Sequence, residues 1–163
     1  MNFGADEALA PHHRLQSFSC GEPSLDDWLR RRALANQTSG ASRTFVSCKG
    51  DEAVGYYAIV ASGLSAQEAI GKFRRNMPEP IPVILLARLA VATSHQHFGL
   101  GRSLLHDALA RVVTAADTIG IRGVIVHSLS ERARGFYLGH GFEPSPADSM
   151  LLMVTIADLR AAL

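Results

Sequence analysis

Two glycines, Gly99 and Gly101, lie in the stretch from Gln96 to Ser103, between an apolar run and a long amphipathic segment. Because glycine has no Cβ, backbone N–H groups beside it can approach an anion closely, and the helix that follows adds the positive end of its dipole. This spacing predicts a cradle for a diphosphate group. The alternative is a tight turn that only closes a helix against a strand.

Two other nucleotide-binding motifs fail at the same residues. A P-loop needs a lysine after its last glycine, whereas Gly101 is followed by Arg102 and Ser103. A dinucleotide fingerprint needs a third glycine where this chain has Leu104, and an acidic residue at the end of the next strand. The predicted strand over 123–128 ends without one.

The cysteines and histidines do not suggest a second site. Cys20 and Cys48 have no neighbouring His or Asp pattern, so we expect neither a nucleophile nor a disulfide, and a reducing cytoplasm fits. His95, His97 and His106 lack metal-ligand spacing, and His12 and His13 lie in a start that we expect to be mobile. No metal is predicted.

The elements that must position the glycine turn follow from periodicity and from turn residues. We expect helices over 24–36, from 100 to near 120, over 131–138 and over 157–163, and strands over 44–47, 53–62, 83–91, 123–128 and 150–156. Ser24 is the expected N-cap of the first helix. The segment 65–82 ends in Pro78, Pro80 and Pro82, so we expect it to be extended.

Composition is compatible with one domain over residues 1–163. Hydrophobic residues make up 47% of the chain, enough for a single core, and no run is long and apolar enough to cross a membrane. The formal net charge of +1 does not identify a nucleic-acid binder. Only Lys49 and Lys72 are lysines, however, so the basic residues are mostly arginines, whose planar fork suits phosphate oxygens as well as structural ion pairs.

The glycine turn resembles the Gln/Arg-x-x-Gly-x-Gly/Ala signature of the GNAT N-acetyltransferases. The resemblance implies an α/β GNAT fold, with a mixed, mostly antiparallel sheet whose central strands splay and are flanked by helices. It also implies acetyl-CoA as co-substrate. The cofactor-binding residues that it implies are Leu89, Ala90 and Val91 for the pantetheine arm, and Gln96, His97, Phe98, Gly99, Leu100, Gly101, Arg102 and Ser103 for the diphosphate.

Acetyl transfer to an amine needs a neutral amine, a donor to the oxyanion and a proton for the departing thiolate. Phe136–Tyr137 with Gly141–Phe142 resembles a family pattern in which the tyrosine lies near the thioester sulfur. Tyr137 is therefore the expected general acid, and the alternative is a buried tyrosine with a satisfied hydroxyl. The Val91 N–H is the oxyanion donor that the resemblance implies. No side chain stands out as base, and Ser128 and Ser130 replace an Asn that many relatives carry.

A wider pattern is similar to the GNAT toxins of toxin–antitoxin modules. It is carried by Phe18-x-Cys20-Gly21, Leu25-Asp26-x-Trp28-Leu29, Ala35-Asn36-Gln37, Ser42-Arg43-Thr44, Gly55-Tyr56-Tyr57, Ile81-Pro82-Val83 and Leu86-x-Arg88-Leu89-Ala90-Val91. This resemblance implies acetylation of the amino acid on aminoacyl-tRNA, which blocks translation, restraint by a ribbon-helix-helix antitoxin, and a homodimer. A GNAT enzyme for a small amine or a protein N-terminus, and a non-catalytic module that keeps the CoA cradle, are the alternatives.

Five basic residues are candidates for tRNA contact: Arg43, Lys72, Arg74, Arg75 and Arg88. Contacts from such residues to phosphates would position tRNA without reading its sequence. The alternative for the cluster at 72–75 is a solvated loop.

Overall fold

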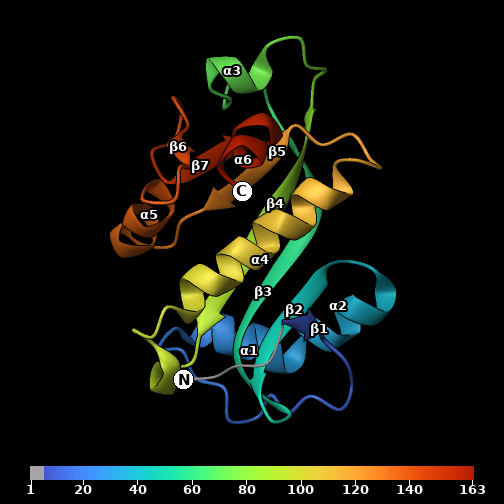
Figure 1. Cartoon of the computed structure of the whole chain (residues 1–163), viewed down its shortest axis with the longest axis vertical. Coiled ribbons are helices and arrows are strands. Elements are labelled where there is room, and N and C mark those ends of the chain that lie inside the picture. Colours follow the sequence, from blue (N-terminus) through green and yellow to red (C-terminus); the bar gives the residue numbers. More distant parts are fainter. Residues whose placement is uncertain (1–5) are drawn as a thin grey trace. The chain divides into compact units, whose positions relative to one another are not determined.

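The structure is a computed structural model that describes residues 6–163 (Figure 1). The elements, in chain order, are β1 (Glu7–Ala8), α1 (Pro23–Arg31), α2 (Ala33–Ser39), β2 (Arg43–Lys49), β3 (Glu52–Leu64), α3 (Gly71–Arg74), β4 (Ile81–Val91), η1 (Thr93–His95), α4 (Leu100–Ala115), β5 (Gly123–His127), α5 (Glu131–Leu138), β6 (Glu143–Pro144), β7 (Leu151–Thr155) and α6 (Ile156–Ala162). The predicted strands and the helices over 131–138 and 157–163 are present within two residues of their expected ends, whereas the helix from 100 ends at Ala115 and not near 120. Residues 1–5 of the predicted domain lie outside the described part.

The strands are hydrogen-bonded in the order β1-β2-β3-β4-β5-β7-β6. β4 and β5 pair in parallel, whereas the β1–β2, β2–β3, β5–β7 and β6–β7 pairs are antiparallel. The parallel pairing runs only from Val83↔Gly123 to Leu85↔Ile125, although β4 continues to Val91. This is the mixed, mostly antiparallel sheet with splayed central strands that the resemblance implies.

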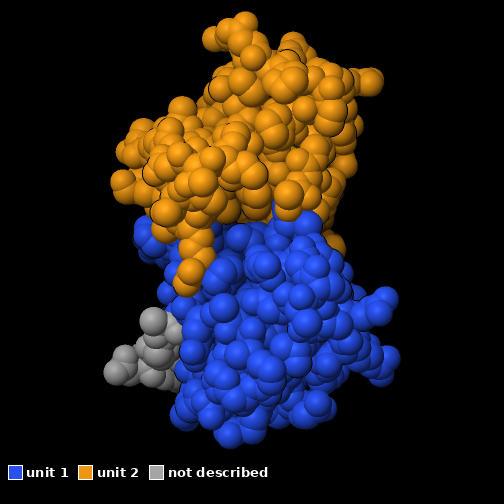
Figure 2. Space-filling model, turned by 90° about the vertical axis from the view of Figure 1, so that its right-hand side faces the viewer, with its two compact units in different colours: residues 1–60, 87–108 blue, residues 61–86, 109–163 orange. Residues whose placement is uncertain are grey.

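Contacts within the chain divide it into two compact units (Figure 2). Unit 1 comprises residues 1–60 and 87–108, and unit 2 comprises residues 61–86 and 109–163. The boundaries fall inside β3, β4 and α4, so both units draw on the same elements. The single domain over 1–163 stays a prediction. Of the helices in the described part of the chain, none is long and apolar enough to span a membrane.

In unit 1, α1 and α2 lie beside β2 (Figure 1) and bury Leu29 and Ala33 in a core with Phe18, Val46 and Tyr56. The prediction of one helix over 24–36 is wrong, because the chain leaves helical geometry at Arg32, which has φ −122° and ψ −30°.

The predicted N-cap of that first helix, Ser24, is wrong as well. The helix begins at Pro23, with Glu22 at the cap position and no side-chain cap. Proline suits the first helical position because its missing N–H would be unpaired there in any case.

In unit 2, α3, α5 and α6 pack on β7 (Figure 1), around a core that includes Phe73, Leu151 and Met153. The expectation that 65–82 contains no helix is wrong, because α3 forms ahead of the prolines and buries Phe73 completely. Gly123 marks the closest packing here: a Cβ on it would lie 2.2 Å from the Val154 carbonyl oxygen. No side chain fits at that position.

Candidate active site

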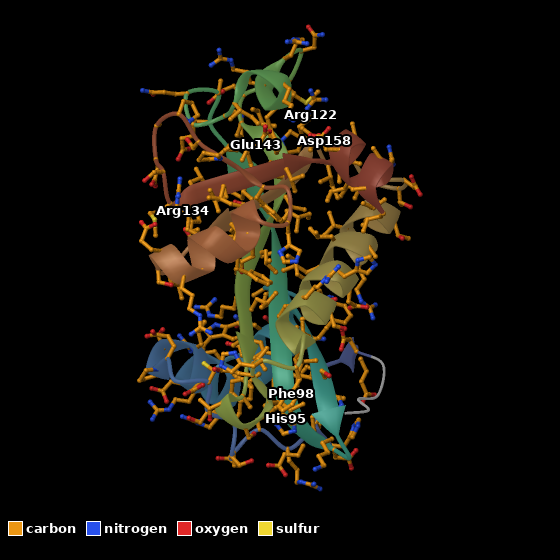
Figure 3. All side chains as sticks on the ribbon, turned by 60° about the vertical axis from the view of Figure 1, so that its left-hand side comes forward. His95, Phe98, Arg122, Arg134, Glu143 and Asp158 are labelled. Atoms are coloured by element: carbon orange, nitrogen blue, oxygen red, sulfur yellow. The ribbon has the colours of Figure 1, made fainter. Side chains whose placement is uncertain are left out.

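The glycine turn leaves β4 through η1 and enters α4, all within unit 1. His97 has φ +70° and Gly99 has φ +83°, so the backbone is left-handed on both sides of Phe98. Glycine takes this conformation without penalty, which explains residue 99, whereas a histidine there is strained. The two reversals place Phe98 on the surface beside His95, with 59% of Phe98 exposed (Figure 3).

The backbone N–H groups of this turn are available to a ligand. Ser103 donates to the Gly99 carbonyl at 3.1 Å, which closes the first turn of α4. Within residues 6–163, the N–H groups of residues 97–102 have no hydrogen-bond partner. Several adjacent amides at the N-terminus of a 16-residue helix are suited to binding an anion, and the diphosphate cradle stays a prediction. If these N–H groups were already hydrogen-bonded within the protein, the predicted diphosphate cradle would have been contradicted.

The glycines leave room that the protein itself does not fill. A Cβ on Gly99 would meet nothing within 4 Å, and one on Gly101 would lie 3.8 Å from Val91 Cγ2, an ordinary contact. Packing within the chain therefore does not require glycine at 101. A ligand lying against the turn would require it, so the residues fit a CoA diphosphate.

The strand residues predicted to meet the pantetheine arm form the end of β4. Ala90 is buried, whereas Leu89 and Val91 are half-buried. The Val91 carbonyl accepts a hydrogen bond from Gln96 Nε2 at 2.9 Å, so this oxygen is engaged within the protein. The Leu89 and Val91 contacts to pantetheine stay predictions.

Tyr137 lies on α5 in unit 2, where Ser130 caps the helix by accepting from the Ala133 N–H. Its ring packs edge-on against Phe142, with centroids 5.5 Å apart, and burial raises the pKa of its hydroxyl to about 12. Among the described residues this hydroxyl has no hydrogen-bond partner. This oxygen is not among the buried side-chain atoms that lack a partner in the described part of the chain, so it keeps access to solvent, and the role of Tyr137 as proton donor stays a prediction.

The serines that replace the family's Asn are both engaged. Ser128 Oγ donates to the Met150 carbonyl at 2.8 Å, and Ser130 Oγ accepts from the Ala133 N–H. Both hydroxyls thus serve the packing and capping of unit 2.

Arg88 is held in place by an aromatic ring. Its guanidinium carbon lies 4.3 Å from the centroid of Trp28, which stacks in turn on the buried Tyr56. No acceptor for the Arg88 donors exists among residues 6–163, so the guanidinium is oriented and keeps its hydrogen-bonding capacity. Arg43, at the start of β2, is exposed and donates to the Gln37 carbonyl at 2.7 Å.

The basic cluster of unit 2 divides into two kinds of residue. Lys72 Nζ lies 2.7 Å from Asp158 Oδ2 and 2.9 Å from Glu143 Oε2, which raises the pKa of the lysine and lowers that of Asp158. Figure 3 labels the two carboxylates, Glu143 and Asp158. Arg74 and Arg75 are exposed. Since two carboxylates already balance the Lys72 charge, Arg74 and Arg75 are the stronger candidates for phosphate contact.

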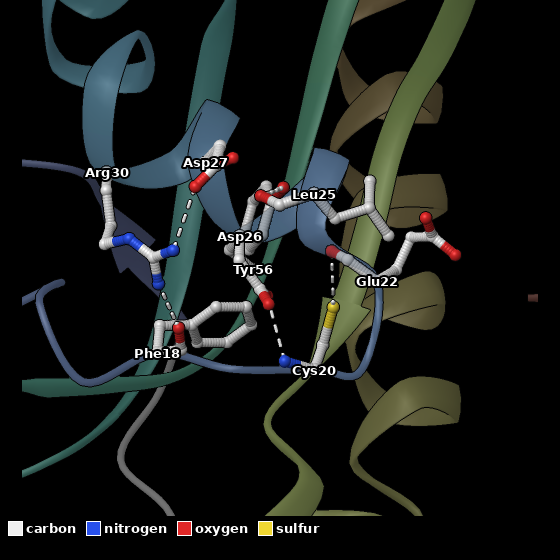
Figure 4. Close-up of polar contacts among 8 residues, drawn as sticks. All are labelled: Phe18, Cys20, Glu22, Leu25, Asp26, Asp27, Arg30 and Tyr56. Atoms are coloured by element: carbon white, nitrogen blue, oxygen red, sulfur yellow. Dashed lines mark hydrogen bonds and ion pairs between the residues drawn. The ribbon is translucent and has the colours of Figure 1, made fainter.

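The cysteines are free, and neither is activated. Burial raises the pKa of each thiol to about 11, and Asp26, whose carboxylate accepts from the Cys20 N–H, adds to the effect at Cys20 (Figure 4). Thiolates are the reactive form, so these pKa values oppose a nucleophilic role.

His13, expected in a mobile start, is buried instead and groups with Glu7 and His12 as possible metal ligands. Its Nδ1 accepts from the Ala10 N–H at 3.0 Å, which uses the single lone pair of a neutral imidazole. Its Nε2 lies 3.2 Å from Glu7 Oε1 but makes no hydrogen bond within residues 6–163. The absence of a metal at these residues stays a prediction.

Comparison with known proteins identifies related chains. Residues 40–144 match the family model described as an acetyltransferase (GNAT) domain. The chain is 49% identical over 159 residues to a tRNA-acetylating toxin of Mycobacterium tuberculosis, covering 98% of this chain and 96% of the relative.

Two solved structures have a similar fold. One is AtaT complexed with acetyl-methionyl-tRNAfMet, with a TM-score of 0.89 and 26% identity, covering 97% of this chain and 98% of that one. The other is a mutant of the toxin AtaT bound to the C-terminus of the antitoxin AtaR, with a TM-score of 0.84 and 26% identity, covering 97% of this chain and 95% of that one.

Proposed function

The chain belongs to the GNAT family and is an acetyl-CoA-dependent acetyltransferase, and we propose that its acceptor is the α-amino group of the amino acid on charged tRNA. The observation that carries the acceptor is the 49% identity, over nearly the whole of both chains, to a tRNA-acetylating toxin. The open amides of residues 97–102 support the co-substrate independently, because they are donors placed for a diphosphate.

The chemistry needs no covalent enzyme intermediate. The neutral amine attacks the thioester carbonyl, a C–N bond forms, the C–S bond breaks, and the CoA thiolate leaves. In this proposal the Tyr137 hydroxyl donates its proton to that thiolate, the Val91 N–H faces the oxyanion, and water collects the proton from the amine. The pKa of about 12 keeps Tyr137 protonated at neutral pH, as a proton donor requires.

Phosphate contacts in this proposal come from arginines rather than from overall charge. Arg88, held on Trp28, and the exposed Arg43 are offered by unit 1, and Arg74 and Arg75 by unit 2. An arginine whose plane is already fixed loses less entropy when it binds a phosphate, so Arg88 is the contact expected to contribute most.

The expected protein partners are inferred from the same similarity to GNAT toxins. We infer that an antitoxin of ribbon-helix-helix type restrains the protein and that two copies form a homodimer. AtaT bound to the C-terminus of AtaR supports the antitoxin. Since charged tRNA is used in translation, we infer that the protein acts in the cytoplasm.

The test is transfer of radiolabelled acetyl from acetyl-CoA by the purified protein. Charged tRNA should be labelled, whereas uncharged tRNA, free amino acids and a peptide with a free N-terminus should not. Tyr137→Phe protein serves as the control for enzyme-dependent label. Label on the peptide or a small amine alone would make this an ordinary GNAT enzyme, and acetyl-CoA binding without any transfer would make it a binding module.

A further inference from the structure

The Gln96 side chain points into the protein and not toward the open amides. Its Nε2 donates to the Cys20 carbonyl at 3.0 Å and to the Val91 carbonyl at 2.9 Å. We propose that Gln96 is a positioning residue, which clamps the end of β4 to the loop before α1, and is not a ligand of the diphosphate. The proposal rests on the turn binding acetyl-CoA, but not on the identity of the acceptor.

The donor inventory of the side chain carries the first step. A primary amide has two N–H donors, and both are directed at carbonyl oxygens of the protein. The remaining polar atom is Oε1, which only accepts hydrogen bonds and therefore cannot bind an anion. A direct contact between Gln96 and a phosphate would require both existing bonds to break.

The clamp closes a set of bonds that join three segments of unit 1. The Thr93 N–H donates to the Ser19 carbonyl at 2.8 Å, and the Ala92 N–H donates to the Val54 carbonyl at 2.8 Å. The Cys20 N–H donates to Asp26 Oδ1 at 2.9 Å, which ties the same loop to α1 (Figure 4). Gln96 joins this loop to β4 directly before the turn begins, so it sets the starting point of the turn.

One peptide plane shows what the clamp fixes. The Val91 carbonyl and the Ala92 N–H belong to the same rigid peptide, and each has a partner, Gln96 on one side and Val54 on the other. The orientation of this peptide, where the acyl arm is expected, is thereby set before any ligand arrives. Such preorganisation affects the reacting end of the co-substrate as well as its diphosphate.

The clamp requires a side chain with two N–H donors, and this side chain need not be an amide. Gln96→Arg keeps N–H donors within similar reach, Gln96→Met keeps the unbranched shape without donors, and Gln96→Glu places a carboxylate against two carbonyls. We expect Gln96→Met and Gln96→Glu to bind acetyl-CoA about tenfold more weakly in calorimetry, as the loss of two hydrogen bonds implies. Gln96→Arg should stay within about threefold of the native protein.

Acetyl-pantetheine, which lacks the diphosphate, separates positioning from direct contact. With whichever acceptor the native protein uses, Gln96→Met should lower kcat/KM for acetyl-pantetheine by about the same tenfold factor. An unchanged rate with acetyl-pantetheine, together with weaker acetyl-CoA binding, would make Gln96 a diphosphate ligand and overturn the proposal. Native affinity in Gln96→Met, or a loss in Gln96→Arg as large as in Gln96→Met, would also overturn it.

The experiment keeps its meaning if one variant does not fold or if tRNA is not the acceptor. Thermal melting identifies an unfolded Gln96→Met protein, and the comparison of Gln96→Arg with Gln96→Glu then decides in the same way. Failure of the native protein to acetylate charged tRNA would defeat the proposed acceptor alone. The acetyl-CoA affinities of the Gln96 variants would still test the clamp.

Discussion

At the scale of single residues, Tyr137 joins a buried ring to a hydroxyl without a partner in the described part of the chain. We expect Tyr137→Phe to lower kcat by about 10²-fold or more, the range for loss of a general acid, with acetyl-CoA affinity nearly unchanged. Tyr56→Phe is the matched control, because the Tyr56 hydroxyl donates to the Leu25 carbonyl at 2.7 Å. It should cost about 1 kcal/mol of unfolding free energy and leave kcat intact. Equal rates for native and Tyr137→Phe protein would remove Tyr137 from the chemistry.

The pH dependence follows from the same tyrosine. Its protonated form is the active one, and burial raises the pKa to about 12, so that form persists through the neutral and mildly alkaline range. The acceptor amine must be neutral and has a reference pKa of about 7.7 to 8.0. The rate should therefore rise with pH through about 8 and show no fall from Tyr137 below about pH 10. A decline centred near pH 9 that disappears in Tyr137→Phe would contradict this assignment.

A substitution at Gly101 should affect acetyl-CoA binding without lowering the stability of the fold. Gly101→Ala adds a Cβ that meets only Val91 Cγ2 at 3.8 Å, so unfolding in urea should show unchanged or slightly higher stability. Acetyl-CoA affinity should fall by about 10-fold to 100-fold, because the methyl group enters ligand space. Gly99→Ala is the contrasting variant: its φ of +83° should cost about 1–2 kcal/mol of stability. Full acetyl-CoA affinity in Gly101→Ala would exclude close approach at this turn.

At the scale of elements, the sequence was enough to place α4 from apolar residues at helical spacing, β5 and β7 from short apolar runs that are almost wholly buried, and α5 from the glycines that follow it. The break at Arg32 could not be predicted, since the apolar pattern continues from α1 into α2 while the turn depends on tertiary packing. α3 was not predicted because the prolines that follow it indicate an extended segment. The single aromatic residue Phe73, which is buried, was the one sign that this segment packs against the core.

The candidate site shows the same division between local and long-range information. The open amides at 97–102 follow from local glycine spacing, which the sequence displays directly. The bond from Gln96 to Cys20 joins residues 76 positions apart, and no local pattern encodes such a contact. Likewise, the pairing of Lys72 with Glu143 and Asp158 depends on how α3 meets β6 and α6.

Arg122 tests how α3 is attached to its neighbours within unit 2. Its Nε donates to the Phe73 carbonyl at 2.9 Å and its Nη2 to the Lys72 carbonyl at 2.6 Å. Arg122→Ala should lower the free energy of urea unfolding by about 1–3 kcal/mol, because both carbonyls lose a partner. Asp158→Asn, which weakens an exposed ion pair with Lys72, should cost less than about 1 kcal/mol. The reverse ranking of these two variants would show that the ion pair, and not Arg122, holds α3.

At the scale of the whole molecule, a formal net charge of +1 means that tRNA binding must rely on local arginines. Reversing Arg74 and Arg75 to Glu should weaken tRNA binding and reduce the slope of log affinity against log salt by roughly 1 to 2, as loss of one or two phosphate contacts implies. The control reverses Lys49 and Arg160 to Glu, which changes the net charge equally at residues outside the candidate set. Equal effects of the two pairs, in a filter-binding titration, would show that total charge governs affinity.

Both ends of the strand order are two-residue strands, β1 and β6. Each has a glutamate, Glu7 or Glu143, and β6 ends in Pro144, which has no N–H to donate. Short, charged or proline-bearing margins resist the addition of a foreign strand, the route by which exposed sheets aggregate. Overproduced protein should therefore aggregate little through β1 and β6.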